Sequence, residues 1–588
     1  MSAINEVEDE EKNQPLNNDP EAIGEVSPTK IKLLYGITVG GVLLIVVLVA
    51  IIVIFVGNNN NDINNQNNDT NKNDTNKNDT DVDIIPNVYS SFKAIYETLN
   101  QGQEIKLINE SYLDQISLMY IDNQKVDISN ITNIYTFNNT GEHKVIFGFG
   151  KSLESTEEMF KDCNNLIEID FTNFKTNELK NMAAMFCGCT SLNSINLNSF
   201  DTKKVTNMSH LFEECYVLVK IILDKIDTSN VIDMKYMFSK CELIRSLNLN
   251  NFNTKKVKEI KYMFYNCYSL TNLEIGNNFI LSGISDLSGL FYNCFLLSKI
   301  NITNIDTSET RDMSNMFRRC SKIPSIDLSK YDTSKAVNIS GMFSGCYKLK
   351  YLDLSNFDTS NVEDMHDLFS ECIELSDLNL KNFKTSKVKN MDQMFYFCKS
   401  LESLDLSNFD TSEVLTMNKM FDFCSLLEKI DLSNFDTSKV TDMGFMFAAC
   451  PELISIDLSN FNTQNVINLE NMFYGDHSLI DIDLSSFNTT NLIYINHMFD
   501  GCTSLTNLNL SNFYTPNLYS LVGLFSNCYN LTDIDIRNFS TESLVDNNTY
   551  IFQGRNSNGT VYYNSKLFDE KLFNVVFKGW EIVDVNSD

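Results

Sequence analysis

A phenylalanine that stands after a methionine in most cases, and three residues before a cysteine, recurs along most of the chain. The recurring residues are Phe160, Phe186, Phe212, Phe238, Phe264, Phe291, Phe317, Phe343, Phe369, Phe395, Phe421, Phe447, Phe473, Phe499 and Phe525. Thirteen of the fourteen intervals are 26 residues long, and the interval from Phe264 to Phe291 is 27 because of an extra residue within 276–278. A fixed period without long insertions predicts a solenoid, since one unit buries its apolar face only by stacking on the next.

Each unit carries two hydrophobic patterns. Residues 352–354 (Leu-Asp-Leu) alternate between apolar and polar, which predicts a short strand with one buried face. The apolar residues that follow have the spacing of one helix face: Val362, Met365, Leu368, Phe369 and Cys372. Ser360 and Glu363 before them have the spacing of a helix capping box. The sequence therefore predicts an α/β leucine-rich-repeat solenoid of about fifteen coils over residues 151–540, with one short strand and one short helix in each coil.

The segments on either side of the repeats lack the period and are expected to close the stack. Residues 85–150 are predicted to form a β-rich N-terminal cap, in which residues 134–149 alternate like a hairpin with a turn at 139–141. Residues 541–588, which contain Trp580, are expected to form the C-terminal cap.

Residues 33–56, from Leu33 to Val56, are 24 residues without a charge, long enough to span a bilayer as one helix. A cleaved signal peptide is the alternative, but the apolar run is longer than a signal-peptide core and 32 residues precede it. We therefore expect an uncleaved transmembrane helix. Lys30 and Lys32 flank its N-terminal side, which predicts a cytoplasmic N-terminus and extracellular repeats in the plasma membrane of the cell.

The parts around this helix are polar. Residues 1–32 are acidic and expected to be a disordered cytoplasmic tail, and residues 57–84 are an Asn-rich stalk. Glycosylation is expected at sequons in the stalk (Asn68, Asn73 and Asn78) and in the N-terminal cap (Asn130).

Composition and motifs exclude several function classes. The net charge of −31 argues against a surface that binds nucleic acid through its phosphates. The five histidines are scattered without a metal-ligand spacing, and the chain has no phosphate-binding loop, nucleophile elbow or dinucleotide fingerprint. We therefore expect no enzyme activity, cofactor or metal.

Fourteen of the fifteen cysteines occupy one position of the repeat, and Asp476 takes that position in the coil of Phe473. A buried ladder of thiols explains the position, because cysteine is a small apolar residue. Disulfides between adjacent coils are the alternative, since stacked coils lie within disulfide reach and the extracellular space is oxidising. Cys187 lies outside this position and is expected to be exposed.

The polar residue in the middle of each predicted strand points outward, and it is acidic or asparagine in nearly every coil. The acidic stripe proposed to bind a partner comprises Asp327, Asp353, Asp405, Asp431, Asp457 and Asp483. Continuous stacking of strands would space its carboxylates about 5 Å apart and favour a cationic partner. A solvated face that prevents aggregation is the alternative.

The repeats resemble the BspA-like leucine-rich-repeat surface proteins, on the phrase LSNFDTS-x-V-x-x-M-x-x-MF-x-x-C and its 26-residue period over about residues 155–540. The resemblance implies a cell-surface protein with an extracellular repeat array that contacts a host or matrix protein. The expected function is adhesion through an extracellular protein or matrix ligand. The alternative is a receptor that signals through its short cytoplasmic tail.

Overall fold

The structure is a computed structural model, and it describes residues 88–300, 302, 304–545, 551, 558–568, 577 and 579–586. The predicted cytoplasmic tail, the membrane helix of residues 33–56 and the stalk with Asn68, Asn73 and Asn78 lie outside these residues. Among the residues that are described, no helix has the length and apolar character needed to cross a membrane.

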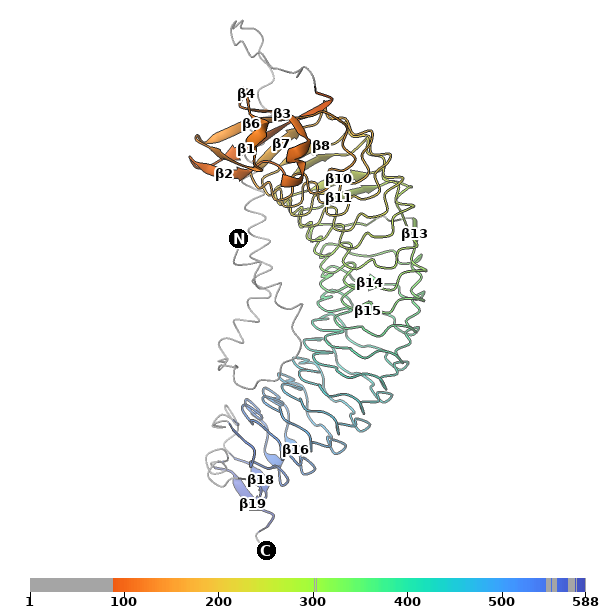
Figure 1. Cartoon of the computed structure of the whole chain (residues 1–588). Coiled ribbons are helices and arrows are strands. Elements are labelled where there is room, and N and C mark those ends of the chain that lie inside the picture. The colour runs from red at the N-terminus through yellow and green to blue at the C-terminus, as the bar shows by residue number, and fades with distance from the viewer. Residues whose placement is uncertain are drawn as a thin grey trace, which may run out of the picture. The chain divides into compact units, whose positions relative to one another are not determined.

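An antiparallel sheet precedes the repeats, with the strand order β4-β3-β6-β1-β7 (Figure 1). Its strands are β1 (Ser90–Thr98), β3 (Ile116–Ile121), β4 (Gln124–Lys125), β6 (Gly141–Phe149) and β7 (Leu166–Asp170). Two 3₁₀ helices, η1 (Glu110–Gln115) and η2 (Ile128–Asn130), lie between these strands in the chain. Because β7 belongs to the first repeat and pairs with β1, with Lys93 opposite Asp170, the sheet extends directly into the solenoid.

The predicted hairpin of residues 134–149 is wrong in its pairing. Its two strands exist, but β5 (Ile134–Phe137) pairs with β2 (Gln103–Lys106), whereas β6 pairs with β1 and β3. Residues 145–149 are all buried, so β6 is a central strand with a neighbour on both edges.

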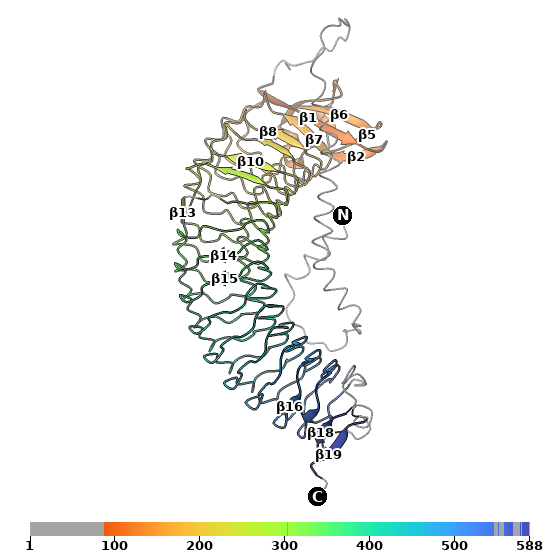
Figure 2. The same ribbon diagram turned by 180° about the vertical axis from the view of Figure 1, so that it is seen from behind.

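The coils stack in chain order, as the two opposite views in Figures 1 and 2 show. Parallel strands 26 residues apart pair in register: β8 (Ser194–Asn196) with β9 (Lys220–Ile222), β10 (Ser246–Leu249) with β11 (Asn272–Ile275), and β14 (Tyr351–Leu352) with β15 (Asp377–Leu378). Within the 27-residue interval the offset differs, because β12 (Ile280–Ser282) pairs with β13 (Asn304–Asp306) 24 residues on, with Leu281 opposite Ile305. Gly276 precedes this change, and a Cβ there would lie 2.1 Å from the carbonyl oxygen of Asn250.

The predicted helix in each coil is wrong, and within the described residues the repeats contain no α-helix. In the coil of Phe369 the left-handed residues Asp367 (φ 56°) and Glu371 (φ 58°) stand four apart and interrupt any helical path. Main-chain N–H groups of Met365, Asp367, Phe369 and Glu371 donate to carbonyls of the next coil at 2.6–3.1 Å. The N–H groups between them, such as that of Leu368, donate to the carbonyl three residues back. The segment is therefore a series of tight turns, and the fold is a β-solenoid rather than an α/β solenoid.

The repeating phenylalanines form one column through the core. Successive rings, such as those of Phe343 and Phe369, stack with centroids 5.9 Å apart and an interplanar angle of 5°. A second column of parallel bridges joins equivalent residues of adjacent coils, for example Asp364 with Asn390. The predicted stacking of the repeats is thus confirmed, although turns replace the helices.

The polar letters of the recurring phrase LSNFDTS have structural roles. The Thr359 hydroxyl donates to the carbonyl of Lys384 at 2.9 Å and accepts from its N–H at 2.7 Å. The Asn408 amide donates to the carbonyls of Leu380 and Phe383 in the preceding coil, at 3.0 and 2.6 Å. The phrase recurs because each coil needs the same bonds to its neighbours.

The last strands continue the parallel stack. β16 (Asn507–Asn509), β17 (Asp533–Asp535), β18 (Thr560–Tyr563) and β19 (Glu581–Asp584) form one four-stranded sheet. Trp580 is buried before β19, and its ring meets that of Phe577 with centroids 6.0 Å apart.

Candidate functional site

The six aspartates of the acidic stripe all begin the same local turn. One carboxylate oxygen of each accepts a hydrogen bond from the main-chain N–H of the serine two residues ahead, at 2.9–3.1 Å. These serines hold the pKa of all six carboxyls below the ordinary value. All six side chains are exposed, so the stripe (Asp327, Asp353, Asp405, Asp431, Asp457 and Asp483) is ionised at neutral pH.

The expected continuous sheet under this stripe is absent where the stripe is most acidic. Within the described residues, the segments around Asp405, Asp431, Asp457 and Asp483 are not assigned as strands. The local turn to the serine therefore positions each carboxylate, and the stacking of the coils repeats it. This turn was not predicted from the sequence, although the serine two residues after each aspartate is a sign of it.

The cysteine position forms a column of buried thiols. Each thiol from Cys189 to Cys528 donates to the carbonyl of the phenylalanine 29 or 30 residues back; for Cys372 this is Phe343, at 3.2 Å. All fifteen cysteines are free, as expected for a ladder of thiols and not for disulfides between adjacent coils. Burial raises the pKa of Cys346 and Cys398 to about 12, so these thiols remain protonated at neutral pH.

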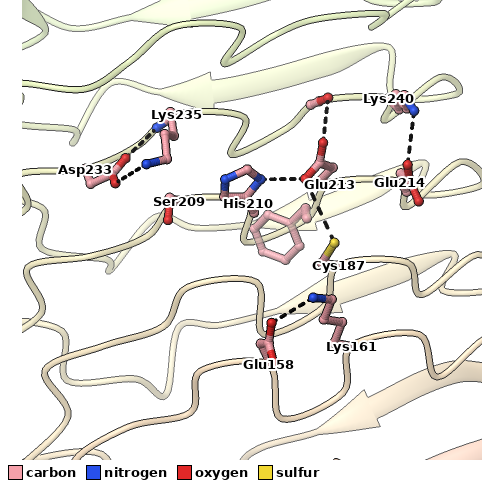
Figure 3. Close-up of polar contacts among 12 residues, drawn as sticks. Glu158, Lys161, Cys187, Ser209, His210, Glu213, Glu214, Asp233, Lys235 and Lys240 are labelled. Atoms are coloured by element: carbon pink, nitrogen blue, oxygen red, sulfur yellow. Dashed lines mark hydrogen bonds and ion pairs between the residues drawn. The ribbon is translucent and has the colours of Figure 1, made fainter. Parts of the chain in front are cut away.

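Cys187, which was expected to be exposed, is half-buried in a polar cluster of the early coils (Figure 3). Its thiol lies 4.0 Å from a carboxylate oxygen of Glu213, and the same oxygen is 2.5 Å from Nδ1 of His210. The ion pairs Lys161–Glu158 (2.7 Å) and Lys240–Glu214 (3.0 Å) flank it. The carboxylate thus stands between the thiol and the imidazole.

This arrangement does not activate the thiol. In a thiol–imidazole nucleophile pair, the imidazole accepts the thiol proton and the carboxylate stands behind it. Here burial and then the charge of Glu213 raise the pKa of Cys187 to about 12, so the unreactive thiol form dominates at neutral pH. We interpret the cluster as polar contacts that support the coils, within one coil for Lys161–Glu158 and between two coils for Lys240–Glu214.

A groove of about 580 Å³ lies on the turn side of the later coils. Ala449, Gly475 and Gly501 line its middle, at the repeat position that Phe397 and Phe423 occupy in the two preceding coils. A Cβ on Gly475 would meet only the Cα of Ala449, at 3.8 Å, so the surface at Gly475 is open, whereas a Cβ on Gly501 would lie 3.2 Å from the Cα of Gly475. This groove was not predicted from the sequence, although the change from phenylalanine through alanine to glycine at one repeat position indicates it.

Aromatic and polar side chains surround the small residues of this groove. Phe423, Tyr474 and Tyr529 supply rings. His477 Nδ1 lies 2.8 Å from the carbonyl oxygen of Gly501, so this nitrogen carries the proton. Asp500 accepts from the Asn527 amide at 2.7 Å and lies 3.0 Å from His497 Nδ1. The lining contains no lysine or arginine.

Asn130, the predicted glycosylation site within the described residues, is the last residue of η2 and is exposed.

A family model described as "Mycoplasma protein of unknown function, DUF285" matches five overlapping segments of the chain. They are residues 144–222, 196–294, 285–379, 368–457 and 446–565, which together cover more than two thirds of the 588 residues. No curated protein sequence matches the chain.

Two solved structures show a weak likeness. The functional domain of InlJ from Listeria monocytogenes, described as including a cysteine ladder, is 12% identical and covers 79% of this chain and 84% of its own, with a TM-score of 0.16. A TLR13–ssRNA13 complex is 14% identical and covers 73% of this chain and 75% of its own, with a TM-score of 0.14. At TM-scores this low, the likenesses carry no weight for the ligands of this chain.

Proposed function

The chain belongs to the DUF285 family, and we propose that it is a cell-surface protein whose solenoid binds an extracellular protein or matrix ligand and so mediates adhesion. The observation that carries this proposal is that the residues that join the coils and the exposed residues occupy different positions of the repeat. The recurring polar residues bond to neighbouring coils, so the exposed positions are free to carry a binding surface on a rigid scaffold.

The acidic stripe is the surface we assign to the ligand. Asp405, Asp431, Asp457 and Asp483 stand on four consecutive coils, and each is exposed. Hydrogen bonds from serine keep their pKa values low, so the four carboxylates form a row of negative charge, with Lys381 4.0 Å from Asp405 at one end. Such a row favours a cationic protein surface and makes binding sensitive to salt.

The chain supplies a conservative way to remove these charges. Asn379 occupies the same repeat position and accepts the same bond from the N–H of Lys381 at 3.1 Å. Changing the four aspartates to asparagine therefore removes four charges and keeps the turns.

A matched control stands in nearby coils. Asp332, Asp358, Asp410 and Asp436 accept equivalent bonds at another repeat position, where Asn462 and Asn488 replace aspartate in later coils.

The experiment compares cells that display the full chain with either set of four Asp→Asn changes, on surfaces coated with matrix protein. We expect the stripe set to reduce adhesion at least about tenfold and to remove most of its salt dependence, while the control set leaves both unchanged. Equal effects of the two sets would refute the stripe as the binding surface.

The topology is part of this proposal and has its own test. The uncharged run of residues 33–56 and the flanking Lys30 and Lys32 support an N-terminal anchor with the repeats outside the cell. Protease added to intact cells should remove the repeats and leave a short protected fragment. Protected repeats would overturn the assignment.

The receptor alternative makes a different prediction from the same chain. Deleting residues 1–29 should leave adhesion intact if the protein is an adhesin, whereas it should abolish a response of the cell if the tail signals.

A further inference from the structure

Three consecutive coils lose every charge along one side. Residues 460–469, 486–495 and 512–521, which are equivalent in the repeat, contain no Asp, Glu, Lys or Arg, and Glu470 directly follows the first of them. The equivalent segment of an earlier coil carries Asp358, Glu363 and Asp364, and that of the next carries Lys384, Lys387 and Lys389. In a chain with 21% charged residues, the loss of charge in three successive coils marks a distinct surface.

Large apolar and aromatic side chains are exposed on this surface, among uncharged polar ones. Main-chain bonds place Ile467, Ile493 and Tyr519 side by side, since the N–H of Ile493 donates to Ile467 at 2.9 Å and that of Tyr519 to Ile493 at 3.0 Å. Ile467 is 40% exposed, Tyr519 48% and Tyr494 42%. The rings of Tyr494 and Tyr519 adjoin, with centroids 6.5 Å apart.

Amides replace ion pairs beside this apolar row. The Asn491 and Asn517 side chains donate to the carbonyls of Gln464 and Thr490 in the preceding coils, at 2.8 and 2.9 Å. At the same repeat position earlier coils carry the ion pair Glu413–Lys439, at 2.6 Å. We call residues 464–468, 490–494 and 516–520 the uncharged face.

We propose that the uncharged face binds the same face of a second copy of this chain. A net charge of −31 makes two copies repel wherever their acidic surfaces meet, and this face is where they approach without that cost. Exposed Tyr and Ile with depleted charge are the composition of an interface core. The side-chain amides can both donate and accept, so the face is complementary to itself.

The symmetry of such a contact fixes its centre. A twofold contact places equivalent residues of the two copies around one axis. Because the face spans three coils, an axis through the middle coil brings residues 490–494 of one copy against residues 490–494 of the other. Tyr494, exposed and central, therefore faces its own counterpart.

The test changes Tyr494 to aspartate in the full chain, purified in detergent, and measures the association state by sedimentation. Asp442 occupies the same repeat position, so an aspartate fits the coil. Asn390→Asp adds the same charge at this position outside the face and is the control. We expect the wild type and Asn390→Asp to dimerise at micromolar concentrations, and Tyr494→Asp to raise the dimer dissociation constant at least about tenfold.

A cross-linking measurement makes the outcome independent of affinity. In a Cys187→Ser background, Tyr494→Cys should form a disulfide-linked dimer under mild oxidation, whereas Asn390→Cys should not. A monomeric wild type, a dimer unaffected by Tyr494→Asp, or equal cross-linking of the two cysteine variants would overturn the proposal. The acidic stripe takes no part in these measurements, so failure here leaves the adhesion proposal standing.

Discussion

The main-chain N–H of Cys450 donates to the carboxyl of Asp476, 2.8 Å away, inside the core. Asp476 occupies the repeat position that holds a buried thiol in the other fourteen coils, and it is fully buried. Its second oxygen has no hydrogen-bond partner among the described residues. Asp422, also fully buried, contributes to raising the pKa of Asp476, although burial is the main cause.

This substitution predicts that acid stabilises the later coils. A carboxyl whose pKa is higher in the folded than in the unfolded chain binds its proton more tightly when folded. Its contribution to stability is complete below the ordinary pKa of about 4 and is lost as the pH rises through the raised folded value. Asp476→Asn keeps the acceptor for Cys450 without the titration. We expect the two proteins to have the same free energy of unfolding near pH 4. Toward pH 8 the variant should become increasingly more stable than the wild type. The difference should grow by up to about 1.4 kcal/mol per pH unit between the pKa of Asp476 in the unfolded chain and its pKa in the folded chain.

Thermal melting of both proteins across pH 4–8 measures this difference. Asp405→Asn is the control, because its exposed carboxyl has a lowered pKa and its loss should not reproduce the trend. A constant difference between Asp476→Asn and the wild type at all pH values would contradict the raised pKa.

The thiol column predicts that no disulfide joins adjacent coils. Cys372→Ala removes one buried sulfur and its bond to Phe343, which should cost about 1–3 kcal/mol locally while the other coils remain folded. Mass spectrometry of the unreduced, alkylated protein should find every cysteine modified. A peptide linking Cys372 to Cys398 would show that the disulfide alternative holds in the cell.

The sequence predicted the solenoid but not the path of the chain within a coil. The period and the burial of Phe369 and Cys372 follow from spacing alone, because any repeating unit must stack its apolar residues. The helix prediction failed because a series of turns with left-handed residues four apart gives the same apolar spacing as a helix face. Ser360 and Glu363 have capping-box spacing, yet Ser360 accompanies a turn at Asp358 and Glu363 pairs with Lys389 in the next coil.

A single glycine substitution distinguishes the turns from a helix through its effect on stability. Gln393 has a φ of 55°, a conformation that costs a residue with a side chain about 1 kcal/mol more than glycine. Gln393→Gly should therefore leave the stability unchanged or raise it by up to about 1 kcal/mol, whereas glycine inside a helix lowers it by about 0.5–1 kcal/mol. Ser386→Gly, on the same coil without a positive φ, should destabilise. Denaturant unfolding measures both, and a clear loss of stability in Gln393→Gly would contradict the turn geometry.

The candidate surfaces were predictable to different degrees. The acidic stripe followed from one repeat position, because aspartate or asparagine recurs there. The groove and the uncharged face depend on what departs from the repeat, as when Gly475 and Gly501 replace larger residues or Ile493 replaces a charge. Such departures show which coils differ, but only the stacking shows that the altered positions adjoin.

The buried threonines predict a specific cost for separating two coils. The hydroxyl of Thr359, 1% exposed, is both donor and acceptor for the main chain of Lys384. Thr359→Val keeps the shape but leaves that N–H and carbonyl without the hydroxyl, at about 1–3 kcal/mol for each group. Thr359→Ser keeps both bonds and loses one methyl, which should cost about 1 kcal/mol. Hydrogen exchange should show faster opening at Lys384 in Thr359→Val alone, with the coils beyond Phe421 unaffected. Equal losses of stability in the two variants would mean that the methyl group, rather than the paired hydrogen bonds, stabilises the contact between these two coils.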